Sequence, residues 1–153
     1  MKKIKPFIYF ILISLMTGAL AAFLTKDSMD IYKDIIKPPL SPPAAAFPIV
    51  WSALYILMGA GAAIVYSSES IYKGTAILAY TMQLSANFLW SIIFFNLRAY
   101  KAAFLWILVL LMTIAVMIYF FNKISKTAAY LQIPYFIWVI FAAYLTFAIA
   151  VLN

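Results

Sequence analysis

The chain has 153 residues, of which 68% are apolar and 10% are charged, and its formal net charge is +7. Soluble domains carry about 25% charged residues, so this composition excludes a soluble globular protein. The positive charge does not call for a nucleic-acid partner, because membrane proteins gather lysines at their interfaces with water. The lipid bilayer is therefore the expected environment.

Charged residues divide the chain into five long uncharged stretches. About twenty apolar residues span the hydrocarbon core of a bilayer. The pattern predicts an all-α integral membrane protein, in which a single domain over residues 1–153 forms a five-transmembrane-helix bundle. The helices are expected near residues 6–25, 43–67, 74–96, 102–122 and 128–151.

The first predicted helix also allows a second interpretation. Lys2, Lys3 and Lys5 resemble the basic start of a secretory signal, and "TGALAA" at 17–22 offers small residues for cleavage. The apolar run is longer than the 7–15 residues of a usual signal. We therefore expect a membrane helix here rather than a cleaved signal peptide.

Residues 26–43 are expected to form a proline-rich loop before the second helix. Four prolines lie within six residues of it: Pro38, Pro39, Pro42 and Pro43. Prolines favour a stiff, extended chain, and Pro43 is expected to open the second helix at its first turn. A loop ordered in advance loses less entropy when it closes over a ligand, so this segment is a candidate lid.

Lysine and arginine in the short flanks predict the orientation in the membrane. Six of these residues lie on the side of the N-terminus and five on the opposite side. The small excess favours a cytoplasmic N-terminus.

The missing residue types limit the chemistry. The chain has no cysteine and no histidine, which removes thiol catalysis, zinc sites and the usual axial ligands of haem iron. All four acidic residues lie outside the predicted spans, whereas proton pumps need an ionisable group at membrane depth. We expect no metal and no cofactor, and these absences argue against a conventional hydrolase, metalloenzyme or proton antiporter.

Aromatic and polar side chains recur on single faces of three predicted helices, because helical residues three, four or seven apart share a face. The second helix carries Phe47, Trp51, Tyr55 and Met58. The third carries Gln83, Asn87 and Ser91, with Trp90 alongside, and the last carries Pro134, Trp138, Ala142 and Leu145. Trp106 instead fits the aromatic belt at the membrane interface.

Two interpretations of these stripes remain open. Gln83 and Asn87 are costly in lipid and should point inward, where they can form hydrogen bonds between helices. Alternatively, the stripes converge below the proline-rich loop and form a largely apolar pocket. The donors would be the Trp51 and Trp90 indoles, the Asn87 amide and the Tyr32 hydroxyl, which suit a flat, apolar, partly carboxylated ligand.

Several motifs together resemble the translocator protein family, whose members include tryptophan-rich sensory proteins and the peripheral benzodiazepine receptor. They are Tyr32, "KPPLSPP" (37–43), "VWSALYILMGAG" (50–61), "NFLW" (87–90), "FFNLR" (94–98) and "IPYFIWVIFAAYL" (133–145). The resemblance covers the whole chain, and it implies a five-helix bundle, commonly a homodimer, with a pocket beneath the first loop.

The resemblance also implies a ligand and its site. Family members bind porphyrins, notably protoporphyrin IX, here a ligand rather than a cofactor. The matching positions are Tyr32, Pro42, Trp51, Asn87, Trp90, Trp138 and Ala142, and the stripe of the second helix adds Phe47. The function implied is that of a tetrapyrrole-binding membrane sensor or regulator in a bacterial-type plasma membrane. The alternatives are light- and oxygen-dependent porphyrin degradation, with Trp51 and Trp138 as catalytic residues, and transport of tetrapyrroles or sterol-like molecules.

Two features qualify these expectations. Position 40 is Leu and position 31 is Ile, where the family pattern has aromatic residues, so the loop has lost stacking surface. Gly59 with Ala63, or Gly61 with Val65, offers small surfaces four residues apart, which favour close helix approach. These pairs serve either a dimer contact or packing within one bundle.

Overall fold

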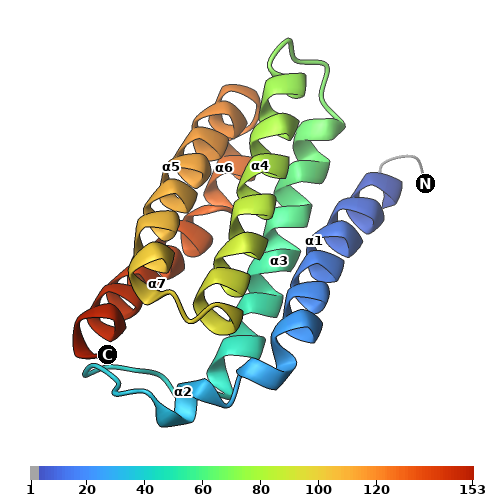
Figure 1. Ribbon diagram of the computed structural model, residues 1–153. Helices are drawn as coiled ribbons and strands as arrows, with labels where there is room; N and C mark the ends of the chain where they lie inside the picture. Colours follow the sequence, from blue (N-terminus) through green and yellow to red (C-terminus); the bar gives the residue numbers. More distant parts are fainter. Residues whose placement is uncertain (1–3) are drawn as a thin grey trace.

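The computed structural model describes residues 4–153, so Lys2 and Lys3, which entered the orientation prediction, lie outside the described residues. Over this range the chain is mostly helical, and the longest connection is the loop over residues 35–45 (Figure 1). In chain order the elements are α1 (Ile4–Thr25), the 3-10 turn η1 (Lys26–Ser28), α2 (Ile31–Asp34), α3 (Ala46–Tyr66), α4 (Lys73–Ser91), the π-helical turn η2 (Ile92–Asn96), α5 (Tyr100–Ile124), α6 (Lys126–Tyr130) and α7 (Ile133–Leu152).

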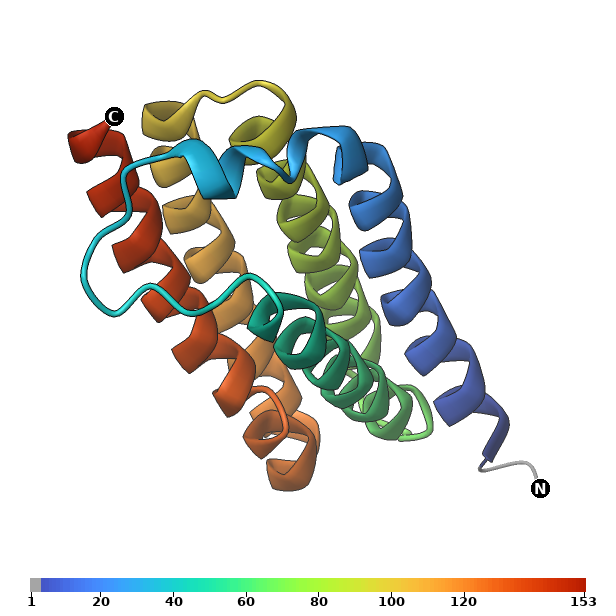
Figure 2. The same ribbon diagram turned by 90° about the horizontal axis from the view of Figure 1, so that it is seen from below.

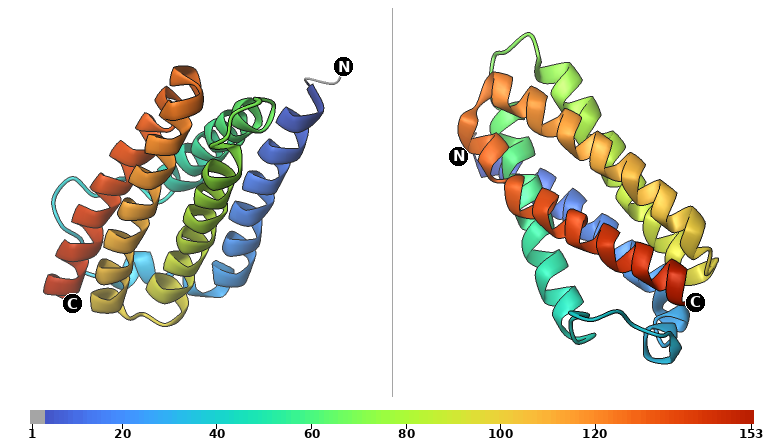
Figure 3. Two further views of the ribbon diagram at one scale, coloured as in Figure 1. Left: turned by 90° about the horizontal axis from the view of Figure 1, so that it is seen from above. Right: turned by 90° about the vertical axis from the view of Figure 1, so that its left-hand side faces the viewer.

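The five predicted spans are confirmed. Five helical segments of residues 4–153 are long and apolar enough to cross a membrane. They form a bundle in which α1 packs along α3, α4 along α5, and α5 along α7 (Figures 1 and 3). Large apolar side chains remain exposed on the outer faces of these helices, as the hydrocarbon core of a bilayer requires. The chain is an integral, multi-pass membrane protein.

The helices α3 and α7 touch at only a few points, as α3 and α5 do. The chain between α2 and α3 crosses this side of the bundle. From α2, which lies across the end of the bundle, it runs along α7 and reaches the first turn of α3 (Figure 2). The loop thus connects α7 with the start of α3 on this side of the bundle, in the place that was predicted for the candidate lid.

Two details of the lid differ from the prediction. Residues 26–34 are not extended, because most of them form η1 and α2. The region from Ile35 to Pro43 has no helix, and a turn at Pro39 and Leu40 interrupts it. Pro43 does not open α3, which begins at Ala46. The Pro43 carbonyl instead accepts a hydrogen bond from the Ala46 N–H at 2.9 Å, so the chain makes a turn before the helix starts.

Two glycines of α3 serve packing within the bundle. A Cβ built on Gly59 would lie 2.4 Å from the Ile11 Cα of α1, and one on Gly61 would lie 2.2 Å from the Gln132 Nε2. Their partners Ala63 and Val65 are fully buried as well. Neighbouring segments of the same chain already fill the space beside both glycines. The hypothesis that these small residues form a contact between two copies is therefore wrong.

Candidate ligand-binding site

A chain of aromatic rings fills the space between the lid, α3 and α7. Phe47, in the first turn of α3, lies edge-on to Tyr32 of α2 at 5.2 Å between ring centroids. The same ring lies edge-on to Trp138 of α7 at 6.1 Å. Trp138 in turn contacts Phe141 at 5.5 Å. Three of the predicted site residues are therefore neighbours, although they come from three different elements.

Hydrogen bonds hold the lid over these rings. The Tyr32 hydroxyl donates to the Pro42 carbonyl at 2.8 Å, and the Tyr144 hydroxyl of α7 donates to the Pro39 carbonyl at 3.0 Å. Asn153 pairs with the backbone of Ile36, accepting from its N–H at 3.1 Å and donating to its carbonyl at 3.0 Å. The predicted residues Tyr32 and Pro42 thus bind each other, within a lid that is attached to α7.

The Tyr32 hydroxyl keeps its proton at neutral pH. Partial burial raises the pKa of Tyr32 above its ordinary value, and the nearby Ser41 hydroxyl lowers this pKa by a smaller amount. A protonated phenol can donate either to the Pro42 carbonyl or to an acceptor on a ligand.

Trp51 belongs to a second aromatic group, one turn deeper in α3. Its ring lies 5.8 Å from that of Tyr55 and 6.2 Å from that of Tyr135 of α7. Because α3 begins at Ala46, Trp51 lies about 7.5 Å inside the helix at 1.5 Å per residue, shallower than a start at Pro43 predicts. Trp138 contacts Phe47 and Phe141 instead, so the two tryptophans lie in neighbouring aromatic groups. The prediction from sequence missed Tyr135, whose hydroxyl at membrane depth needs a hydrogen-bond partner.

Asn87 lies at the centre of a buried hydrogen-bond network that joins α3, α4 and α7. Its Nδ2 donates to the Tyr135 hydroxyl at 2.8 Å, and its Oδ1 accepts from the Tyr55 hydroxyl at 3.3 Å. The Tyr135 hydroxyl donates to the Gln83 Oε1 at 2.7 Å. The interpretation of Gln83 and Asn87 as interhelical hydrogen-bonding residues is therefore confirmed. Asn87 also bonds to both tyrosines whose rings contact Trp51.

Replacing Tyr135 by Phe is expected to lower the free energy of unfolding by about 1–2 kcal/mol, because Asn87 and Gln83 each lose a buried partner and bonds of this kind in membranes are modest. Thermal unfolding in one detergent measures the change. Tyr130→Phe, which removes the hydroxyl of a side chain that is 69% exposed, is the control and should change little. Equal stability of Tyr135→Phe and the parent would contradict the network.

Two tryptophans carry buried indole N–H groups without a partner. Among the described residues, the Nε1 atoms of Trp90 and Trp138 are buried and make no hydrogen bond. Trp106 differs, because its Nε1 donates to the Ala86 carbonyl of α4 at 2.8 Å. Trp106 therefore links α5 to α4, a contact that its assignment to the interfacial belt did not predict. An unpaired buried donor is costly, so a ligand acceptor next to the Trp90 or Trp138 N–H would form a favourable hydrogen bond.

The remaining predicted residues lie at different distances from this cluster. Ala142 is buried one turn after Trp138 on α7, and its carbonyl accepts from the Thr146 hydroxyl at 2.7 Å. Trp90 stacks on Phe94 at 5.2 Å, next to the π-helical turn η2. Its ring neighbours are Phe94 and Phe95 rather than Trp51 or Trp138, so the structure does not bring Trp90 into the aromatic cluster.

Leu40 does not contribute to the aromatic cluster. Its side chain is 81% exposed, and its φ of 71° lies in the left-handed region that disfavours a side chain. The position that the family pattern gives to an aromatic residue therefore points away from the rings. The chemistry offered by the site consists of stacking surfaces with indole, phenol and amide donors.

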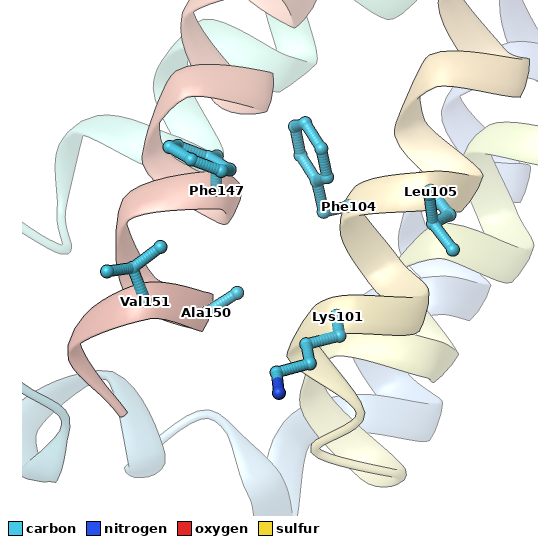
Figure 4. A pocket seen from close by; sticks show the side chains of 6 residues that line it. All are labelled: Lys101, Phe104, Leu105, Phe147, Ala150 and Val151. Carbon is cyan, nitrogen blue, oxygen red and sulfur yellow. The ribbon is translucent and has the colours of Figure 1, made fainter.

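An open groove on the outer surface is separate from this site. It has a volume of ≈ 480 Å³ and lies between α5 and α7, where Phe104 and Phe147 face each other across it and Lys101 lies at its mouth (Figure 4). Their ring centroids are 5.1 Å apart. None of the predicted site residues lines this groove.

The sequence profile of the TspO/MBR family matches residues 10–152. The chain belongs to the TspO/MBR family. The match includes every predicted site residue from Tyr32 to Ala142, so the aromatic cluster under the lid is part of the family domain.

Curated relatives agree with this assignment. The chain is 33% identical over 135 residues to "Tryptophan-rich protein TspO" of Chlorobaculum tepidum, covering 87% of this chain and 85% of that protein. It is 33% identical over 122 residues to "Tryptophan-rich sensory protein" of Cereibacter sphaeroides, covering 80% and 76%. It is also 30% identical over 119 residues to "Translocator protein" of Ovis aries, covering 76% and 70%. TspO/MBR proteins named as sensors and as translocators are thus both similar to this chain.

Proposed function

We propose that this TspO/MBR protein is a membrane sensor or regulator that binds a protoporphyrin IX-type tetrapyrrole between α3 and α7, under the proline-rich lid. The observation that carries the proposal is the unpaired, buried indole N–H of Trp138. It lies in the ring cluster that the lid covers, and a ligand carboxylate would satisfy it.

The lining suits a flat and apolar molecule with acidic groups. Phe47, Trp51 and Trp138 offer ring surfaces for stacking, and the Tyr32 hydroxyl is a second donor at the lid. Phe47 and Trp138 contact each other, whereas Trp51 contacts Tyr55 and Tyr135. Binding therefore requires the lid and Phe47 to move, so that the ligand replaces the contacts between the rings.

Light-dependent degradation of the porphyrin is the second candidate function. Trp51 lies against two tyrosines, Tyr55 and Tyr135, so oxidisable rings adjoin the proposed site. In this alternative Trp51 and Trp138 are the catalytic residues and molecular oxygen is the oxidant. The name "translocator protein" of the ovine relative favours the third hypothesis, transport, which stays a prediction.

A titration of the purified protein with protoporphyrin IX, first in the dark and then under illumination, tests the proposal. We expect saturable binding at one site per chain, with a shifted porphyrin absorption band. Haem should bind no more tightly, because the chain has no histidine or cysteine to ligate its iron. Oxygen-dependent loss of the bound spectrum in light would favour degradation. Tighter binding of haem, with a ligated-iron spectrum, would contradict the proposed mode of recognition.

Three further parts of the proposal concern assembly and location. We propose a homodimer in a bacterial-type plasma membrane, with the N-terminus in the cytoplasm. Only the family resemblance supports the dimer, because the small residues of α3 pack within the bundle. The orientation is supported by the small excess of lysine on the N-terminal side.

A further inference from the structure

A second groove lies at the opposite end of the bundle from the lid. It has a volume of ≈ 360 Å³ and is lined by Lys5, Pro6, Tyr9 and Phe10 of α1 and by Tyr66, the last residue of α3. The N-terminal half of α1 leans away from α3 at this end (Figure 1). The groove is therefore an opening between two membrane helices, close to where they leave the bilayer.

The floor of this groove is fixed by the bundle. The Phe10 ring lies 5.4 Å from that of Tyr66 and 5.7 Å from that of Tyr80. Tyr80 is buried, and its hydroxyl is hydrogen-bonded to that of Ser14 at 2.6 Å. An apolar chain lying in the groove would thus meet a rigid aromatic surface.

Two lysines flank the mouth of the groove. Lys5 lines it directly, and the Lys73 ammonium lies 5.1 Å from the centre of the Tyr66 ring. The one ion pair within residues 4–153 joins Lys33 to Asp30 and lies on the lid side. Among the described residues neither Lys5 nor Lys73 has a carboxylate partner, although Glu69 is present on the loop between α3 and α4.

The charge of this end matches an anionic occupant. The segments on the N-terminal side carry six basic residues and one acidic residue, Glu69, whereas those on the lid side carry five basic and three acidic residues. Basic residues at the membrane surface attract anionic lipids. The groove between α5 and α7 (Figure 4) carries a single cation, Lys101, on the less basic side.

We propose that the α1–α3 groove binds one anionic phospholipid, with an acyl chain against Phe10 and the phosphate between Lys5 and Lys73. The Tyr9 and Tyr66 hydroxyls lie at the groove, where they can donate to headgroup oxygens. This site is independent of the tetrapyrrole site, since it lies at the other end of the bundle and shares no residue with it.

Native mass spectrometry of the full chain, titrated with dioleoyl phosphatidylglycerol or dioleoyl phosphatidylcholine, tests this proposal. We expect one phosphatidylglycerol to bind more tightly than phosphatidylcholine. Lys5→Gln and Lys73→Gln should each weaken phosphatidylglycerol binding by about fivefold, because one surface lysine contributes roughly that factor. The double variant should lose more than either single variant and should bind the two lipids alike.

Lys101→Gln is the matched control, because it removes one positive charge at the other groove and should leave the affinity unchanged. An equal loss in Lys101→Gln would show a response to total charge and would overturn the site. So would a double variant that binds phosphatidylglycerol like the parent. If the double variant instead split a dimer in lipid-free detergent without changing lipid binding, the groove would be a contact between copies, and the proposal would be wrong.

Discussion

Gly59→Ala is expected to lower the free energy of unfolding by about 3 kcal/mol, at the upper end of the usual cost of overpacking. The added methyl group would lie 2.4 Å from the Ile11 Cα, 2.6 Å from the Ile11 N and 2.8 Å from the Phe10 carbonyl carbon. All three are backbone atoms, so no side chain can turn aside and α1 itself must move. Thermal unfolding in a single detergent measures the change.

Gly74→Ala is the matched control, because no atom lies within 4 Å of a Cβ at that position. It should be neutral or slightly stabilising, since alanine favours a helix more than glycine does. Gly18→Ala should fall between the two, because its methyl group meets the side chain of Tyr55 rather than backbone atoms. If Gly59→Ala unfolded at the same temperature as Gly74→Ala, the close approach of α1 and α3 would be wrong.

Trp138→Ala is expected to weaken protoporphyrin IX binding by about 30-fold, which corresponds to the roughly 2 kcal/mol carried by a central aromatic contact. Trp138→Phe keeps most of the ring surface and removes only the N–H. It should weaken binding by about fivefold, the value of one hydrogen bond. Equilibrium titration of the porphyrin absorption in the dark measures both effects.

Trp106→Phe is the control, because it makes the same change as Trp138→Phe at a tryptophan outside the proposed site. The Trp106 N–H is bonded to the Ala86 carbonyl, whereas that of Trp138 is buried and unpaired. Trp106→Phe should therefore lower stability by about 1 kcal/mol more than Trp138→Phe does, and it should leave porphyrin binding unchanged. Parental affinity in both Trp138 variants would remove Trp138 from the site.

The five spans could be predicted because hydropathy and charge alone decide which segments enter a bilayer. The lid was harder, since proline content predicts stiffness but not the turn at Pro43 or the helix α2 before it. Gly59 and Gly61 illustrate a general limit. Small residues indicate a close approach, yet only the fold shows that the neighbours are Ile11 and Gln132.

The candidate site was predicted in part. Periodicity placed Phe47, Trp51 and Trp138 on inward faces. Phe47 and Trp138 contact each other, and Trp51 packs on Tyr55 and Tyr135. It did not reveal that Asn87 is held by Tyr55 and Tyr135, because a polar residue facing inward suits a ligand and a neighbouring helix equally. The sequence also did not show that the Trp106 N–H is hydrogen-bonded and the Trp138 N–H is not. Whether a carbonyl lies next to an indole depends on how distant segments pack.

The indole N–H signals of the four tryptophans provide the most direct test of ligand binding under the lid. They can be followed by ¹⁵N–¹H NMR during a titration with protoporphyrin IX and assigned with the Trp→Phe variants. The largest change is predicted for Trp138, saturating at one porphyrin per chain, while the signal of Trp106 stays in place. A titration in which Trp138 is unchanged while porphyrin binds, or in which Trp106 shifts most, would contradict the proposed site.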